Sequence, residues 1–193
     1  MKATSILMEE HRYILRCLEV ISEMADCVAK GETMDDRDVD SVLDFLRVYG
    51  DRHHQEKEES VLFPALMKAS HDEEHHCICQ ITFEHNQQRS LLEGIEDALR
   101  TRKGSDFVYY ARRLSELVRE HLRCEEDEVF KRADAILSTE EDERIAAELV
   151  AYDSPILAQQ LKELLKRLVV LEIKYGIYPN SNIRKPHYAR PVS

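Results

Sequence analysis

The sequence predicts an all-α protein, an up-and-down bundle of four long antiparallel helices followed by additional C-terminal helices. Three observations support this fold class. The 193 residues contain only 5 glycines and 5 prolines, which is little turn chemistry for a fold with many strands. Hydrophobic residues make up 43% of the chain and charged residues 34%, a mixture that favours a packed domain over a disordered chain. Long amphipathic segments are joined by short loops, and helices connected in this way lie antiparallel.

The first pair of predicted helices covers residues 4–30 and 35–69. In the first, apolar residues recur at helical spacing, and the pattern ends at Gly31. The second contains Pro64, whose missing N–H predicts a kink in the helix.

The second pair of predicted helices covers residues 71–102 and 104–134. Ser70 and Glu73 have the spacing of a capping box, in which each side chain bonds the backbone N–H of the other residue. This box predicts where the third helix begins. Together the four helices form a predicted bundle domain over residues 1–135.

A C-terminal extension, residues 136–176, is predicted to add two shorter helices, and residues 177–193 to form an irregular tail. One helix begins at a second capping box, formed by Ser138 and Glu141. The other begins at Ser154, an N-cap residue that is followed by a proline.

The last of these helices carries an apolar seam at coiled-coil spacing. This leucine seam consists of Leu157, Leu161, Leu164, Leu168 and Leu171. It either packs on the bundle or pairs with a second copy of the chain, which would give a homodimer through residues 155–175.

The charge balance and the cysteines indicate partners and compartment. Lys and Arg total 27 against 38 Asp and Glu, so the net charge of -11 argues against nucleic-acid binding. The chain shows no signal-peptide pattern and no apolar run long enough to cross a membrane. Its 5 cysteines, an odd number without a framework pattern, fit a reducing compartment. We therefore expect a soluble, cytoplasmic protein with free thiols and no membrane or nucleic-acid partner.

One internal repeat is strict in its spacing. The first copy contains Glu10, His11, His54, Glu58, Glu59 and Phe63. The second copy contains Glu84, His85, His121, Glu125, Glu126 and Phe130. From His54 and from His121 alike, the next three members follow at +4, +5 and +9. The two helical hairpins of the bundle are therefore predicted to be duplicates.

The repeated histidines and glutamates are predicted to meet in one layer. A spacing of four places His54 and Glu58 on one helix face, and likewise His121 and Glu125. Counted from the predicted loops, neighbouring histidines lie at nearly equal heights. A single His-x-x-x-Glu pair in an acidic chain is usually a solvated charge pair. A whole buried layer of them would cost several kcal/mol per unpaired group, so a metal is expected to neutralise it.

These motifs resemble the hemerythrin-like, or HHE cation-binding, domain family. The resemblance rests on Glu10-His11, on the segments 54–64 (HQEKEESVLFP) and 84–89 (EHNQQR), and on 121–130 (HLRCEEDEVF). It covers about residues 4–135 and implies an up-and-down four-helix bundle that holds a non-haem di-iron centre. The terminal ligands it implies are His11, His54, His85 and His121, and the bridging ligands are Glu58 and Glu125.

The types of ligand are consistent with this cofactor. Imidazole and carboxylate without thiolate suit iron or manganese better than a structural zinc site. We expect two non-haem iron ions, with manganese or zinc as substitutes. Six protein ligands for two metals leave positions open for dioxygen, peroxide or nitric oxide.

The resemblance implies redox chemistry of these small ligands, or their sensing, or iron handling, and leaves open whether the protein is an enzyme. The alternative is a helical adaptor, metal-free or with a structural metal, that acts through the leucine seam. Glu10, Glu59, Glu84 and Glu126 either hold imidazole N–H groups or are solvated.

Arg89 occupies a position where the oxygen carriers of the family have a further histidine. Because an arginine cannot bind iron, one iron is expected to be more open. The Arg89 guanidinium is expected either to reach solvent or to pair with a carboxylate such as Glu59 or Glu126.

A second group of potential ligands lies near the start of the third predicted helix. His71, His75 and Cys79 follow one another at i, i+4 and i+8. They form either a surface site for zinc or copper or a solvated polar turn.

Overall fold

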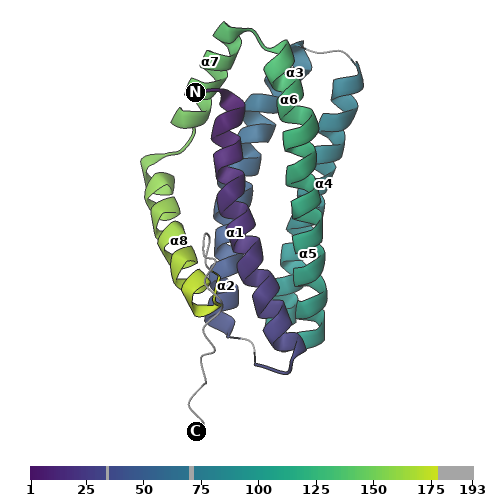
Figure 1. The fold of residues 1–193 in the computed structure, drawn as a ribbon, viewed down its shortest axis with the longest axis vertical. Coiled ribbons are helices and arrows are strands. Elements are labelled where there is room, and N and C mark those ends of the chain that lie inside the picture. Colours follow the sequence, from purple (N-terminus) through teal and green to yellow (C-terminus); the bar gives the residue numbers. More distant parts are fainter. Residues whose placement is uncertain (34, 70–71, 178–193) are drawn as a thin grey trace.

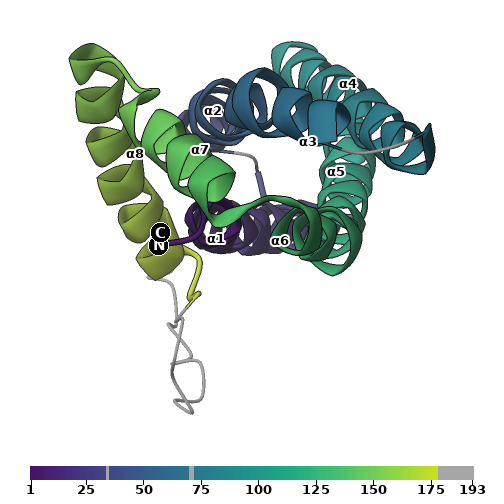
Figure 2. The same cartoon turned by 90° about the horizontal axis from the view of Figure 1, so that it is seen from above.

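The computed structural model describes residues 1–33, 35–69 and 72–177, except for the side chains of residues 72–75, and contains no strand within these ranges. Four long helical stretches form an antiparallel bundle (Figures 1 and 2). The first is α1 (Ala3–Ala29), and the third is α4 (Asp72–Arg100). The predicted limits of these two helices are correct to within two residues. None of the described helices has the length and hydropathy needed to span a membrane.

The second stretch of the bundle departs most from regular α-helix. It runs through α2 (Asp36–Phe45), η1 (Leu46–Gln55), η2 (Glu58–Leu62) and α3 (Phe63–Ala69), of which the two η segments are π-helical. η2 ends just before Pro64, which has no N–H to donate to the preceding turn. No comparable sequence signal marks η1.

The fourth stretch also contains a π-helical turn. It consists of α5 (Gly104–Cys124), η3 (Glu125–Phe130) and α6 (Lys131–Ile136). The π-helical segments contain three of the six candidate ligand residues, His54, Glu58 and Glu125. Such wide turns occur frequently at functional sites because they redirect side chains.

The two further helices that the sequence predicts are present, and both lie against the bundle. α7 (Thr139–Ala151) begins at the capping box of Ser138 and Glu141, in which both bonds are present. α8 (Pro155–Lys174) begins at Ser154, whose side chain accepts from the backbone N–H of Leu157. It is followed by Gly176, whose φ of 69° is left-handed. The predicted box of Ser70 lies outside the described residues.

α7 lies beside the N-terminal end of α1, and α8 runs along the bundle next to α1 and α2 (Figure 1). All five leucines of the seam are buried in the same apolar cluster as residues of α1 and α2. The seam is therefore covered within the chain, and homodimerisation through residues 155–175 stays a prediction. Arg16 in α1 fixes this helix further, because its guanidinium donates to both carboxylate oxygens of Glu172 at 2.7 Å.

The buried apolar side chains form two clusters. One gathers the C-terminal half of α1, α2, parts of α4 and α5, and α8; the other gathers the N-terminal end of α1, α3, α6 and α7. The histidines and glutamates of the repeat occupy the level between the two clusters. All five cysteines, which lie in the described part of the chain, carry free thiols as expected.

Candidate metal centre

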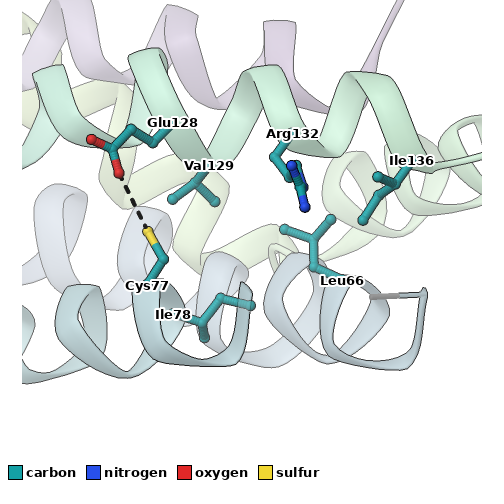
Figure 3. Close-up of a pocket in the computed structure, with 7 residues that line it drawn as sticks. All are labelled: Leu66, Cys77, Ile78, Glu128, Val129, Arg132 and Ile136. Carbon is teal, nitrogen blue, oxygen red and sulfur yellow. Dashed lines mark hydrogen bonds between the residues drawn. The ribbon is translucent and has the colours of Figure 1, made fainter. Parts of the chain in front are cut away.

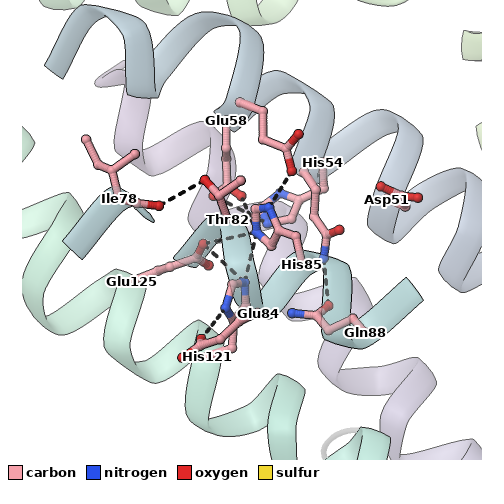
Figure 4. Close-up of polar contacts among 12 residues, drawn as sticks. Asp51, His54, Glu58, Ile78, Thr82, Glu84, His85, Gln88, His121 and Glu125 are labelled. Atoms are coloured by element: carbon pink, nitrogen blue, oxygen red, sulfur yellow. Dashed lines mark hydrogen bonds and ion pairs between the residues drawn. The ribbon is translucent and has the colours of Figure 1, made fainter. Parts of the chain in front are cut away.

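The six residues that the sequence singles out come together in this polar layer. Figure 4 labels five of them, all except His11. They are His11 from α1, His54 from η1, Glu58 from η2, His85 from α4, His121 from α5 and Glu125 from η3. None of them is more than 1% exposed. Residues separated by up to 114 positions in sequence therefore share one water-excluded site.

The layer contains two overlapping groups with the geometry of metal ligands. One consists of His11, His54, Glu58 and Glu125, and the other of His85, His121 and Glu125. Within each group, one ligand atom per residue lies within 4.8 Å of the others. Glu125 belongs to both groups.

Each of the two buried carboxylates faces both groups. One Glu125 oxygen lies 3.4 Å from Nε2 of His11, and the other lies 3.2 Å from Nε2 of His121. The Glu58 oxygens each lie 3.6 Å from an imidazole Nε2, one from that of His54 and the other from that of His85. This placement is the one that bridging carboxylates between two cations require.

Most ligand atoms in the layer lack a partner. Nε2 of His11, Nε2 of His54 and all four carboxylate oxygens of Glu58 and Glu125 are buried and have no hydrogen-bond partner among the described residues. Leaving one buried polar group unsatisfied costs about 1–3 kcal/mol. Because these atoms converge on the same space and are the donor types of a mixed imidazole–carboxylate site, they fit a pair of cations.

The other nitrogen of each imidazole is held by a glutamate. Nδ1 of His11 lies 2.8 Å from Glu126, Nδ1 of His54 lies 3.0 Å from Glu10, Nδ1 of His85 lies 2.7 Å from Glu59, and Nδ1 of His121 lies 2.9 Å from Glu84. An ionised carboxylate only accepts hydrogen bonds, so Nδ1 of each ring carries a proton, and its Nε2 is the nitrogen that faces the layer. Of the two roles open to these four glutamates, the structure shows the imidazole-holding one.

The pairing follows the twofold pattern of the repeat. Glu10 and Glu84 each hold the histidine of the next helix in their own half, whereas Glu59 and Glu126 each hold a histidine of the opposite half. The repeated phenylalanines also cross between halves. Phe130 stacks on His11 with ring centroids 5.3 Å apart, and Phe63 stacks on His85 at 6.3 Å.

The pKa shifts show how the layer behaves without cations. Burial and the neighbouring Glu125 carboxylate raise the pKa of Glu58 well above its usual range. Burial would also raise the pKa of Glu125, but His121 and His11 outweigh it and hold that pKa well below its usual range. Two buried carboxylates this close cannot both ionise cheaply. Cations bound between the two carboxylates would lower the pKa of Glu58 instead of raising it.

The pKa values of two of the histidines shift in opposite directions. Burial lowers the pKa of His54 to about 4, which keeps its imidazole neutral. Burial also opposes the charged form of His121, but the Glu125 carboxylate outweighs it and raises the pKa of His121 to about 9. Metal binding would therefore displace a proton from His121.

Arg89 pairs with carboxylates, one of the two alternatives that the sequence left open. Its Nη2 lies 2.6 Å from Asp51 and 3.1 Å from Glu59, so of the two expected carboxylates Glu59 is the one that it contacts. The contact with Asp51 was not anticipated. Because Glu59 also holds His85, the guanidinium supports the position of that imidazole from outside the layer.

Two glutamines next to the layer were missed by the sequence analysis. Nε2 of Gln55 donates to Oε1 of Gln88 at 2.6 Å, while the remaining amide atoms of both have no partner among the described residues. Both side chains and His54 line an enclosed cavity of about 20 Å³. A space of this size with a free donor and a free acceptor suits one water molecule.

A larger cavity of about 310 Å³ lies between α3, α4 and the η3–α6 segment (Figure 3). Its lining is mostly apolar, and Sγ of Cys77 lies 4.0 Å from Oε2 of Glu128 at its edge. None of the six clustered residues lines it. Of the predicted surface cluster, His71 and the side chain of His75 lie outside the described part of the chain, so that site stays a prediction.

Comparison with known proteins agrees with this geometry. The family model described as the hemerythrin HHE cation binding domain matches residues 2–133. Searches among curated proteins and among solved structures gave no significant match. The matched segment contains all six clustered residues and ends before α7. Because it covers more than half of the chain, the protein belongs to the hemerythrin HHE cation-binding family.

Proposed function

We propose that the protein binds two non-haem iron ions in the polar layer and uses them in redox chemistry of dioxygen, peroxide or nitric oxide, in sensing these molecules, or in iron handling. The terminal ligands would be His11, His54, His85 and His121, and Glu58 and Glu125 would bridge. The observation that carries the proposal is the convergence of buried, partnerless imidazole and carboxylate atoms on one space.

The chain's own residues support iron over zinc. The two groups contain imidazoles and carboxylates and no cysteine, and such donor sets are typical of iron and manganese. The four Nδ1-bound glutamates fix each ring and increase the basicity of its free nitrogen. Bound as a pair, the irons would supply one-electron redox steps at adjacent atoms. Manganese and zinc remain substitutes to be tested.

The surroundings of His54 support access for a small ligand. The cavity beside it has room for a water-sized molecule, and its lining combines apolar side chains with the amides of Gln55 and Gln88 and the charged Asp51 and Arg89. The alternative function, an adaptor that acts through the leucine seam, receives no comparable support, because those leucines are buried against the bundle.

We expect the reduced, iron-loaded protein to oxidise rapidly in air without forming a stable oxygenated state. The reason is that Arg89 cannot supply the extra nitrogen ligand and leaves one iron more open. The measurement is stopped-flow absorption after mixing with air-saturated buffer and, separately, with hydrogen peroxide. Turnover of peroxide would support an enzyme, whereas stoichiometric binding would support a sensor or carrier.

A stable oxygenated spectrum that reverses on removal of oxygen over many cycles would contradict this expectation. Arg89→Lys is measured beside the wild type. Arg113→Lys, at an exposed position, is the matched control for nonspecific effects of replacing an arginine.

A further inference from the structure

The two halves of the repeat differ in what surrounds their imidazole-holding glutamates. The residue before His54 is His53, whereas the residue before His121 is Glu120. The residue before Glu58 is Lys57, and its counterpart before Glu125 is a cysteine. Glu10 therefore has neighbours that Glu84 lacks.

Glu10 is held on both of its carboxylate oxygens. Oε2 accepts from Nδ1 of His54 at 3.0 Å. Oε1 accepts from Nζ of Lys57 at 2.7 Å and lies 3.1 Å from Nε2 of His53. Both carboxylate oxygens are thus held in place by neighbouring side chains.

Asp153, between α7 and α8, completes this cluster. Its Oδ1 accepts from Nδ1 of His53 at 2.9 Å, and its Oδ2 lies 3.9 Å from Nζ of Lys57. Lys57 is only 2% exposed, and a buried ammonium needs anionic partners to offset its lost hydration. Glu10 and Asp153 are those partners, so the Lys57 ammonium has two carboxylates nearby.

Glu84, the counterpart of Glu10 in the second half, is held by fewer contacts. Within the described part of the chain, the other oxygen of Glu84 accepts only from Nε2 of Gln80, at 2.9 Å and from the same helix. The Glu84 side chain is 19% exposed, against 8% for Glu10. Nothing from α7 or α8 reaches Glu84 among the contacts of the described residues.

We propose that Asp153 is a positioning residue for the half of the metal centre that contains His54, so that the C-terminal extension sets the affinity of one of the two cation subsites. The proposal rests on the proposed function, because it requires that the layer binds two cations. Asp153 acts through His53 and Lys57 on Glu10, and through Glu10 on the ring of His54. It lies outside the matched family segment, which ends at residue 133.

The direction of the effect follows from this chain of contacts. Without the Asp153 carboxylate, Lys57 has Glu10 as its remaining anionic partner, and His53 loses the acceptor that orients its ring. Glu10 is then drawn towards Lys57 and holds His54 less firmly. Losing a group that orients a metal ligand typically lowers metal affinity about 10- to 100-fold.

The test is a titration of the metal-free, full-length protein with Co²⁺, followed by visible absorption and calorimetry. We expect two binding steps in the wild type. Asp153→Ala is expected to weaken one step by about tenfold and to leave the other unchanged. Asp153→Asn is expected to have a smaller effect, because its amide oxygen still accepts from His53.

Asp142→Ala is the matched control. Asp142 also joins the extension to the bundle, since its Oδ1 accepts from the backbone N–H of Ala3 at 3.0 Å, but it makes no contact with Glu10. We expect it to leave both steps unchanged.

The outcomes separate this inference from the proposed function. Two unchanged steps in Asp153→Ala, or two steps weakened equally, would overturn the role of Asp153 while the di-metal site stands. If the wild type binds no pair of cations, the proposed function and this inference fall together.

Discussion

Replacing both Glu58 and Glu125 with alanine is expected to abolish binding of both irons while leaving the helical content largely intact. Each carboxylate directs one oxygen to each ligand group, so the double variant removes every anionic ligand of both cations at once. Four neutral imidazoles alone do not offset the charge of two metal ions. The fold is expected to persist because two apolar clusters hold the helices on either side of the layer.

The measurement is iron per chain by elemental analysis after anaerobic loading, together with the far-ultraviolet circular dichroism of the same samples. Glu140→Ala with Glu143→Ala, two exposed positions on α7, is a control with the same change in net charge. Two tightly held irons in the Glu58 and Glu125 double variant would show that the ligand assignment is wrong.

In the metal-free protein, Glu58→Gln and Glu125→Gln are expected to change stability in opposite directions. The pKa of Glu58 is raised in the folded state, so the folded state binds more protons than the unfolded one and stability falls as the pH rises above about 4.3. A glutamine cannot ionise and removes this loss. We expect Glu58→Gln to raise the melting temperature of the metal-free protein at neutral pH.

The pKa of Glu125 shifts in the opposite direction, so its replacement is expected to change stability in the opposite direction. Its pKa is lowered in the folded state by His121 and His11, so its carboxylate stabilises the fold above about pH 4.3 and loses that contribution as the pH falls. Glu125→Gln removes this contribution at neutral pH and is expected to lower the melting temperature.

The measurement is thermal unfolding of chelator-treated proteins at neutral and at acidic pH. The stabilisation by Glu58→Gln is expected to shrink towards acidic pH, where the wild-type Glu58 is protonated in both states. The iron-loaded wild type is expected to melt at a higher temperature than either metal-free variant, because metal ions that bind only to the folded state stabilise it. A loss of metal-free stability in Glu58→Gln equal to that in Glu125→Gln would contradict the account.

Much of the fold could be predicted because the signals that limit helices are local. Gly31, the Ser138 capping box and Ser154 each act within one or two turns, and the structure places helix ends at those points. The η1 and η3 segments could not be predicted, because their wide turns depend on how side chains from other helices fill the layer. Leucine spacing alone also could not decide where α8 packs, since docking and dimerisation require the same seam.

The six clustered residues could be predicted because the repeat fixes both their helix face and their height. The glutamates that hold the imidazoles were harder to predict. Glu10 and Glu84 act within one hairpin, but Glu59 and Glu126 cross to the opposite half, which depends on how the two hairpins are packed. The link from Asp153 to Glu10 had no sequence signal, because it joins an interhelical turn to a residue more than 140 positions away.

The metal content of the protein, purified without added metal, is the most direct test of the central claim. It should be measured by elemental analysis and accompanied by an ultraviolet–visible spectrum. The account predicts a redox-active metal, mainly iron, approaching two ions per chain, and restoration to two when a metal-free sample is offered Fe²⁺ without oxygen. A protein that contains no bound transition metal and takes up none under those conditions would contradict it.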